Sequence, residues 1–520
     1  MLQLKQMFRT SKWLHKYVGL LLLLYGLLMG LSGILVNHPE WISGSSMPGW
    51  LVPAQYQPEG FDRGTLGTLI YSEQDPERAY LAGTEGVWLT EDGGVTFEPM
   101  LDGFPGAPTG RVTNGLLLQE QGPRALWAGT AAGLFVCELE TGRWTHVVLG
   151  KENEPIRSIL NVHGDLVVFT SSHIWRSPNG GVSNHFERLN SVRQVEPEGQ
   201  GESVALIRLF FELHSGAILG FFGRLLFDLV GLAIVFLCAS AFYLWYYPWR
   251  RRSNSDRKQG QGLFQTLFRY HLKIGIWMAP IALLMACTGF FMRPPLLVLP
   301  ATIDIPVAAY PGLPAAQHWT HRIHRAVHDP VRSRVLVEGQ DGFWAVPDDD
   351  LEAPFQALDL PLPVHVMGST VLKSHGAGLV AGSFSGGYKW DADGSVRDLA
   401  TGQAAGDVST LRLAEHTVTG FFTTPTGERF LSTFHAGIVP LDGAQLNGRF
   451  QMPQQMGERY RMSLWNGMFE LHNGRFFRDW IGKLYMLVPI LGSLLFGLLT
   501  ATGIYDWLMV RMIVPRRRGK

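Results

Sequence analysis

Four long apolar segments limit what this chain can fold into. They cover residues 18–36, 221–247, 274–292 and 484–505 of the 520. A helix of about 20 apolar residues crosses the hydrocarbon core of a bilayer, so we predict four transmembrane helices. The first segment could instead belong to a signal peptide, but its apolar run is longer than such peptides carry and no A-x-A cleavage site follows it. We therefore expect it to be a retained helix.

Basic residues gather beside these segments at one side of the expected membrane. They precede the first segment, fill the loop between the second and third, and end the chain: Lys5, Arg9, Lys12, Lys16, Arg250, Arg251, Arg252, Arg257, Lys258, Arg269, Arg511, Arg516, Arg517, Arg518 and Lys520. Lys and Arg concentrate in cytoplasmic loops, so we expect these stretches in the cytoplasm and the protein in the bacterial inner membrane. The regions between would then be periplasmic.

The resulting division of the chain has eight parts. In order they are the cytoplasmic N-terminus with the first helix, a periplasmic region, the second helix, a cytoplasmic loop, the third helix, a second periplasmic region, the fourth helix and a cytoplasmic tail: 1–36, 37–210, 211–249, 250–270, 271–293, 294–470, 471–510 and 511–520.

Composition excludes two classes of protein. The 44 Lys and Arg balance the 44 Asp and Glu, so the chain lacks the basic excess of a nucleic-acid-binding protein, and we expect no nucleic-acid partner. Three cysteines exclude a disulfide-based scaffold. Only 17% of the residues are charged, below the roughly 25% of soluble domains, which agrees with contact to membrane lipid.

Both periplasmic regions are rich in short strand patterns separated by glycine turns. These patterns recur at 79–100, 125–148, 166–189, 335–358, 379–399 and 430–450. Repetition on this scale is typical of propeller-like blades. The stretch from Thr90 to Phe97 resembles the Asp-box of β-propellers, in which the Asp usually caps a turn, so we assign it no catalytic role. The expected fold class is an α+β membrane protein with four transmembrane helices and β-rich, propeller-like periplasmic regions.

An internal repeat relates the two halves of the chain. His15-Lys-Tyr-Val-Gly19 matches His271-Leu-Lys-Ile-Gly275, 256 residues later, and Ser32-Gly33 matches Thr288-Gly289 at the same offset. Phe211-Glu-Leu-His214 matches Phe469-Glu-Leu-His472, 258 residues later. Each half enters the periplasm, folds there and returns. Two such halves are related by a pseudo-twofold axis along the membrane normal.

This repeat predicts two paired histidine sites. His15 and His271 would face each other at the cytoplasmic end of the helices, and His214 and His472 at the periplasmic end. Two imidazoles opposed across a four-helix bundle can hold a haem, so we predict two bis-histidine haem sites. The alternative is that these histidines only meet headgroups and water at helix ends. His38 breaks the repeat and is either another ligand, a proton donor or a plain interfacial histidine, the last being favoured.

A second histidine cluster lies outside the repeat. His321, His324 and His328 fall on one face if the segment is helical. Such a face can bind a metal or an anionic ligand. A solvated face of Arg and His is the interpretation that we favour.

The quoted motifs together resemble the PepSY-associated transmembrane protein family. They are His15-x-x-x-Gly19, Leu31-Ser-Gly33, Leu213-His-x-Gly216 and Leu471-His-Asn-Gly-Arg475, with helices that end in Tyr and Trp. Members include inner-membrane ferric-siderophore reductases of Gram-negative bacteria. The resemblance implies haem b and electron transfer to a ferric-siderophore or other periplasmic acceptor, so that iron is released as Fe(II). No recognisable PepSY module lies in the periplasmic regions.

Two further expectations follow from the haem hypothesis. The haem propionates need cations, which Lys12, Lys16, Arg269 and Lys273 would supply on the cytoplasmic side. No dinucleotide-binding glycine motif follows a strand, so electrons would come from quinol or a separate donor protein. Two alternatives remain open: a membrane-anchored binding or sensor protein without redox activity, and a transporter of haem or siderophore.

Overall fold

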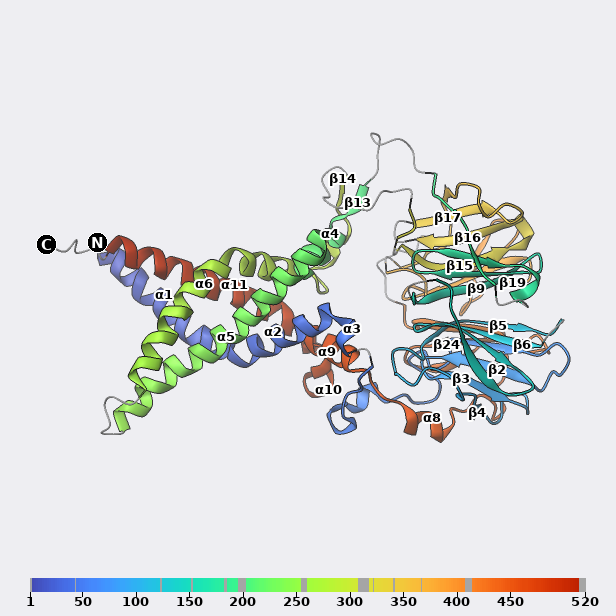
Figure 1. The fold of residues 1–520 in the computed structure, drawn as a ribbon, viewed down its shortest axis with the longest axis horizontal. Helices are drawn as coiled ribbons and strands as arrows, with labels where there is room; N and C mark the ends of the chain where they lie inside the picture. The colour runs from blue at the N-terminus through green and yellow to red at the C-terminus, as the bar shows by residue number, and fades with distance from the viewer. Residues whose placement is uncertain are drawn as a thin grey trace.

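The computed structural model has a helical bundle at one end and a rounded body of β-sheets at the other (Figure 1). It describes residues 2–42, 44–121, 124–150, 153–181, 185–194, 203–253, 260–306, 318–320, 322–339, 342–365, 367–406 and 414–513. The first residues of α1 and the last of α11 lie at the end of the bundle that is far from the sheets.

Five helices build the bundle. They are α1 (Leu2–Leu21), α2 (Leu23–Asn37), α5 (Gly220–Ser253), α6 (Gln261–Phe291) and α11 (Leu487–Ile513). In the described part of the chain, three helical stretches are long and apolar enough to cross a membrane: Ala217–Arg251, Gln261–Phe291 and Arg475–Arg511. Helices α1 and α2 pass the same test as one span bent by 61°, which brings the number of candidate spans to as many as four.

The bend between α1 and α2 separates two packing partners. Helix α1 packs against α11, whereas α2 packs against α5 and α9 (Leu464–His472). The contact of α2 with α5 is close because glycines face the neighbouring helix. A Cβ at Gly30 would lie 2.9 Å from the carbonyl oxygen of Gly231, and one at Gly26 would lie 2.7 Å from the Cys238 sulfur. Small residues at such a crossing let the backbones approach.

The repeat continues into short helices at the sheet side of the bundle. Helix α4 (Leu206–Ser215) ends at Gly216 and α9 is followed by Gly474; these glycines have φ of 76° and 81°. The left-handed conformation suits glycine. In each half of the repeat it interrupts the helical backbone before the long helix begins. His214 and His472 therefore lie on short helices and not within the long spans. The second copy has an additional four-residue helix, α10 (Arg478–Ile481). The remaining helices are α3 (Pro39–Ile42), α7 (Val298–Ala301) and α8 (Gln454–Arg459).

Among the described residues, six antiparallel sheets form the rounded body. The first outer region contributes three of them. The first sheet contains β1 (Thr68–Tyr71), β2 (Ala79–Gly83), β3 (Gly86–Thr90) and β4 (Glu98–Pro99), and the second contains β5 (Thr113–Gln119), β6 (Ala125–Thr130), β7 (Gly133–Glu138) and β8 (Arg143–Val147). The third contains β9 (Ile156–Val162), β10 (Asp165–Thr170), β11 (Ile174–Ser177) and β12 (Glu187–Arg188).

The second outer region contributes the other three sheets. The fourth sheet contains β15 (Ile323–Asp329), β16 (Arg334–Gly339), β17 (Gly342–Pro347) and β18 (Gln356–Leu358). The fifth contains β19 (Val371–His375), β20 (Gly378–Ser383), β21 (Gly386–Trp390) and β22 (Val396–Asp398), and the sixth contains β23 (Val418–Thr423), β24 (Arg429–Thr433) and β25 (Gly437–Pro440). A separate pair, β13 (Ser203–Ala205) with β14 (Asp304–Pro306), lies between the sheets and the bundle.

The predicted strand patterns coincide with the later strands of each sheet, but the first strand of every sheet was missed. Arg157, Arg325 and Lys373 interrupt the apolar alternation of β9, β15 and β19, which hides these strands in the sequence. The first strands make most contacts between sheets: β5 with β2, β9 with β5, β15 with β9, β19 with β15, β23 with β20, and β23 with β1. The contacts thus return to the first sheet.

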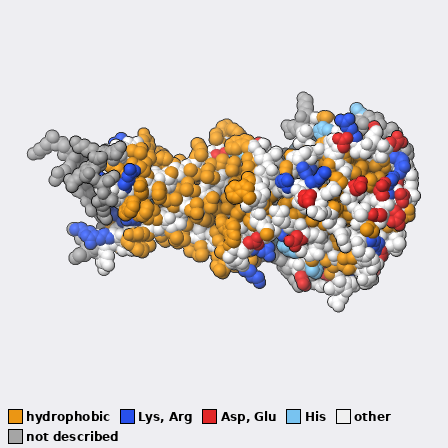
Figure 2. Space-filling model, turned by 90° about the horizontal axis from the view of Figure 1, so that it is seen from below, with side chains coloured by type: hydrophobic (Ala, Val, Ile, Leu, Met, Phe, Trp, Pro, Cys, Tyr) orange, Lys and Arg blue, Asp and Glu red, His pale blue; other side chains and the backbone are white. Residues whose placement is uncertain are grey.

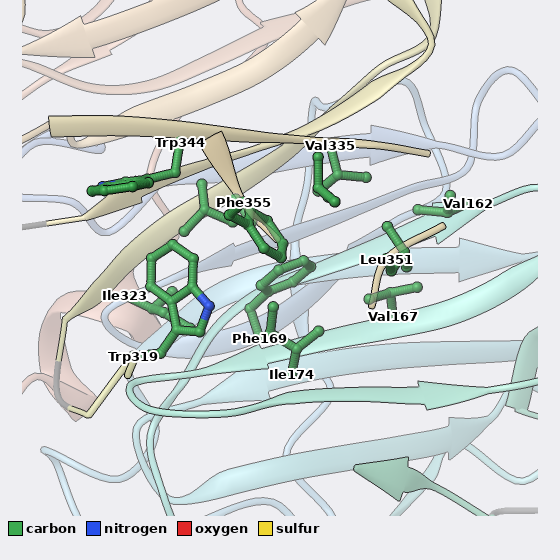
Figure 3. Close-up of a cluster of buried hydrophobic side chains, with 13 residues drawn as sticks. Val162, Val167, Phe169, Ile174, Trp319, Ile323, Val335, Trp344, Leu351 and Phe355 are labelled. Carbon is green, nitrogen blue, oxygen red and sulfur yellow. The ribbon is translucent and has the colours of Figure 1, made fainter. Parts of the chain in front are cut away.

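The third and fourth sheets share a hydrophobic core that joins the two outer regions (Figure 3). Phe169 comes from the third sheet, while Trp319 and Phe355 come from the second region. The rings of Trp319 and Phe355 are 5.1 Å apart and perpendicular. The Arg193 guanidinium lies 4.7 Å from the ring of Trp344 and is 2% exposed. Segments on either side of α5 and α6 are therefore held together by buried contacts.

The surface of the molecule divides in the same way as the fold. Figure 2 shows hydrophobic side chains over the bundle on the visible face, while acidic and basic side chains are spread over the sheets. Asp92, in the predicted Asp-box, accepts hydrogen bonds from the backbone amides of Val95 and Thr96 at 3.0 and 2.9 Å. This carboxylate caps a turn, as predicted from the motif.

Candidate functional site

The outer histidine pair lies where the two short helices meet. His214 is near the end of α4 and His472 ends α9. Their ring centroids are 6.2 Å apart, with an angle of 68° between the ring planes. Two imidazoles that bind one ion from opposite sides, each through a nitrogen at about 2 Å, place their centroids roughly 6 Å apart. The centroid spacing is thus one that would allow both rings to hold the same metal ion.

A hydroxyl fixes the tautomer of each outer histidine. His214 Nδ1 lies 2.9 Å from Thr288 Oγ1, and His472 Nδ1 lies 3.0 Å from Ser32 Oγ. Each hydroxyl donates its own proton to a carbonyl one turn earlier in its helix, at 2.9 and 2.5 Å. The hydroxyl oxygen therefore accepts from Nδ1–H, and the Nε2 of each neutral ring keeps its lone pair. This is the state that a metal-ligating imidazole needs.

A glycine follows each of these hydroxyl residues and makes room for the ring. A Cβ at Gly33 would lie 3.3 Å from His472 Cε1, and one at Gly289 would lie 3.1 Å from His214 Cε1. Any larger residue there would press on the imidazole. The Ser32-Gly33 and Thr288-Gly289 dipeptides, found as part of the sequence repeat, are thus the residues that hold the rings.

Each inner histidine is hydrogen-bonded in the same way as the outer ones. His15 Nδ1, on α1, lies 3.1 Å from the Leu499 carbonyl oxygen and 3.3 Å from Thr502 Oγ1. His271 Nδ1, on α6, lies 2.8 Å from Ser240 Oγ. Thr502 and Ser240 again donate to backbone carbonyls of their own helices. Both inner rings therefore also keep Nε2 for a ligand.

The repeat as recognised in the sequence did not include Ser240 and Thr502, the two hydroxyl residues beside the inner histidines. A signal for them exists, because Ser240-Ala241 and Thr502-Gly503 have similar residues and follow the same repeat. Their offset is 262 residues, whereas the histidines on α4 and α9 are offset by 258. The four residues of α10 account for the difference. A Cβ at Gly503 would lie 3.0 Å from His15 Cε1, which completes the analogy with Gly33 and Gly289.

One cavity connects these residues. It has a volume of about 2810 Å³ and is lined by all four histidines. The cations that the haem hypothesis requires on the inner side, Lys12, Lys16, Arg269 and Lys273, line it as well. The space can thus hold a large ligand beside each histidine pair, with basic groups near the inner one.

The cavity also reaches the sheets, where its walls carry more basic than acidic side chains. The arginines are Arg63, Arg157, Arg293, Arg461, Arg475 and Arg478, and the acids are Glu85, Glu415, Glu470 and, beside His38, Asp228. Burial raises the pKa of Glu85 to about 7, although Arg111 opposes the shift. Near neutral pH, this part of the wall is therefore positively charged.

His38 is placed differently from the four paired histidines. Its Nε2 lies 2.7 Å from Asp228 Oδ2, and its Nδ1 lies 2.8 Å from Glu40 Oε1. The ring also stacks on Trp41 at 3.9 Å. Because carboxylates engage both nitrogens, neither is free for a metal. This arrangement suits a proton-carrying or structural residue better than an additional ligand.

The second predicted histidine cluster is not helical. His324 and His328 lie on strand β15, and His321 lies outside the described residues. The prediction that these histidines share one face of a helix is therefore wrong for this segment, which is a β-strand. His328 Nε2 instead lies 2.9 Å from Asp348 Oδ2, a contact that the sequence did not indicate.

Comparison with known proteins identifies the family. The profile of the PepSY-associated TM region matches residues 12–509. The chain belongs to this family. It is a membrane protein with a few membrane-spanning helices, in contact with lipid. The matched range begins in α1 and ends in α11.

Other similarities are more limited. The uncharacterized protein PA4219 of Pseudomonas aeruginosa is 40% identical over 83 residues, which is 16% of this chain and 20% of that protein. Among solved structures, the extracellular domain of BT4673 from B. thetaiotaomicron has a TM-score of 0.34 at 8% identity, covering 74% of this chain and 39% of that one.

A GH74 xyloglucanase from Xanthomonas campestris has a TM-score of 0.28 at 13% identity, covering 76% of this chain and 53% of the enzyme. The PepSY-associated chain spans less than two thirds of each of these three proteins. TM-scores this low support no further statement about it.

Proposed function

We propose that this PepSY-associated protein is a haem b reductase that moves electrons across the inner membrane to a periplasmic acceptor. His15 and His271 would hold the inner haem, and His214 and His472 the outer one. The observation that carries the proposal is the outer pair, whose rings are 6.2 Å apart and keep Nε2 as the free nitrogen. A bound haem would supply one-electron redox chemistry.

The protein residues determine how that chemistry is used. If the two imidazoles of a pair held the haem iron, they would leave no place on it for an acceptor, which would then receive electrons without binding to the iron. Ser32 and Thr288 hold the outer rings through Nδ1, which orients the ligands and increases their basicity. Lys12, Lys16, Arg269 and Lys273 would neutralise the propionates of the inner haem.

The orientation follows from the same residues. These four basic residues lie at the end of the bundle that is far from the sheets, and basic residues favour the cytoplasm. The sheets would then be periplasmic. We further propose that the six sheets are the blades of one propeller, because their first strands contact one another in a series that returns from β23 to β1.

The acceptor would be a ferric-siderophore at the sheet end of the cavity. This end leads to His214 and His472, and its surplus of arginine favours a chelate with negative charge. Each Fe(III) would take one electron and leave as Fe(II). A quinol, or a separate donor protein, would supply the electrons on the cytoplasmic side, a quinol releasing two protons for each pair of electrons.

Visible spectra of the purified full-length protein test the proposal. Protein from haem-replete cells should be red, with bis-histidine bands that sharpen when dithionite is added. His472→Ala should lose about half of the haem, and His15→Ala the other half, because each substitution removes one ligand of one pair. His38→Ala is the matched control and should keep both haems, since carboxylates engage its nitrogens.

The opposite results would support the alternatives. Colourless protein would exclude the reductase and leave a binding or sensor protein. Haem that is lost equally in all three variants would indicate that the pairs are not the ligands. Haem that exchanges between the two sides of a vesicle would indicate a transporter.

A further inference from the structure

Three metal-ligating side chains meet outside the bundle, on the sheets. His163 Nε2 lies 3.3 Å from Asp348 Oδ2, and His328 Nε2 lies 2.9 Å from the same oxygen. Their ligand atoms all lie within 4.8 Å of one another. We propose that His163, His328 and Asp348 bind one divalent transition-metal ion, of which Zn²⁺ is the best match.

The chemistry of the three groups favours this class of ion. Zn²⁺ in proteins takes imidazole nitrogen and carboxylate oxygen at about 2 Å in a tetrahedral arrangement, so its ligand atoms lie roughly 3.3 Å from one another. The two nitrogen-to-oxygen distances are already close to this value. Two imidazoles favour Zn²⁺ over Mg²⁺ or Ca²⁺, which prefer oxygen ligands. With three ligands, a fourth position stays open to water.

A tight turn places His163 at the edge of the third sheet. His163 and Gly164 form the two-residue turn between β9 and β10, with φ of 52° and 90°. Positive φ at both positions is the type I′ geometry, which favours Asn, Asp or Gly at the first of them. Histidine, like Asn and Asp, is enriched among non-glycine residues at positive φ, so the turn accepts His163, whose Nε2 lies beside Asp348.

The other two ligands are more firmly buried. His328 projects from β15, and its side chain is 19% exposed. Asp348 directly follows β17, and its side chain is 6% exposed. Its backbone amide donates to the Ser333 carbonyl oxygen at 3.2 Å, which fixes the start of the turn. His163 is 62% exposed, so an ion can enter from its side.

The position of the triad suggests its purpose. His163 belongs to the first outer region, whereas His328 and Asp348 belong to the second. The triad lies where the third sheet contacts the fourth, beside the core that contains Val162 and Val346. A bound ion would therefore link the segments that precede α5 and follow α6, and would stabilise the sheets against separation.

Zinc titration of the full-length protein in detergent, after treatment with a chelator, tests this site. Zn²⁺ should bind with one-to-one stoichiometry and raise the unfolding temperature of the sheets, and Co²⁺ should give the visible bands of a tetrahedral complex. In His163→Asn the new residue is compatible with the type I′ turn, but one of the three ligands is lost. Zinc affinity should therefore fall at least about tenfold. His328→Gln should abolish the cobalt bands.

His185→Asn is the matched control. His185 is an exposed histidine on the same outer region, 72% accessible and 3.7 Å from Glu187, and its replacement should leave zinc binding unchanged. If the wild-type protein shows no one-to-one binding, or if His163→Asn binds as tightly as the wild type, the site does not exist. Haem-free histidine pairs of the bundle would also offer nitrogens to zinc, so the difference between wild type and His163→Asn, measured at equal haem content, reports the sheet site independently of the proposed reductase.

Discussion

His214 and His472 lie 6.2 Å apart although each ring is held by a helix from the opposite half of the chain. Thr288, which bonds His214, belongs to the second half, and Ser32, which bonds His472, belongs to the first. The inner rings follow the same rule, because His15 is bonded to α11 and His271 to α5. Neither half therefore contains a complete histidine site.

The hydroxyl of Thr288 should tune the outer haem without being required for it. Thr288→Val removes the acceptor for His214 Nδ1–H, so we expect haem affinity at the outer site to fall about 10–100-fold and its reduction potential to change. Redox titration followed in the visible region measures both. Thr500→Val is the control, because the Thr500 hydroxyl donates only to the Phe496 carbonyl of its own helix. Equal effects in the two variants would contradict the role given to Thr288.

Gly289 should matter for the proposed outer haem site and not for the inner one. Gly289→Ala would place a Cβ 3.1 Å from His214 Cε1 and 3.0 Å from Ser493 Oγ, so the ring or the serine must shift by a few tenths of an ångström, and the proposed outer site should retain less haem. Gly275→Ala is the matched control on the same helix, since its nearest neighbour, Leu237 Cδ2, is 3.8 Å away. The measurement is the haem-to-protein ratio of the two purified variants. A Gly289→Ala protein with as much haem as the wild type would contradict the packing argument.

Glu85 should make the sheets less stable as the pH rises. Burial raises its pKa from 4.5 to about 7 in the folded protein, so between these values the unfolded chain ionises while the folded chain stays protonated. The free energy of unfolding therefore falls as the pH rises between these two pKa values and stays low at higher pH. Glu85→Gln removes the effect, and its advantage over the wild type should grow by up to about 3 kcal/mol between pH 4 and pH 8. Thermal unfolding at both pH values measures this; a constant difference would contradict it.

The shared core of the third and fourth sheets should be required for both outer regions. Phe355 is fully buried against Trp319, so Phe355→Ala should destabilise the sheets by about 3–5 kcal/mol. Val148→Ala, at a side chain that is 66% exposed, should change stability by no more than about 0.5 kcal/mol. Unfolding followed by tryptophan fluorescence compares them, and similar midpoints would show that the two regions are stable separately.

The sequence predicted the family, the repeat and the strand patterns because these depend on local composition. It located Ser32 and Thr288 without their function, since a hydrogen bond between residues hundreds of positions apart leaves no local signal. It also assigned His214 and His472 to continuous helices over 211–249 and 471–510, because nothing in the local sequence shows that Gly216 and Gly474 adopt the left-handed conformation that breaks these helices.

The segment around His328 shows a different reason for failure. Its histidines have helical spacing, yet β16 provides a partner strand along its whole length, and pairing overrides the local pattern. The residues that meet His328 are distant in sequence: His163 lies before two long helices and Asp348 after another strand. Only the packing of two sheets brings them together.

The contact between β9 and β15 has a consequence for how the protein is made. Residues that complete the third sheet leave the ribosome before α5 and α6, and the fourth sheet follows only after both helices. Until then the buried face of Phe169 and Ile174 has no cover. Biogenesis of this protein therefore requires that an incomplete set of sheets persists, protected from aggregation and proteases, while two helices are inserted into the membrane.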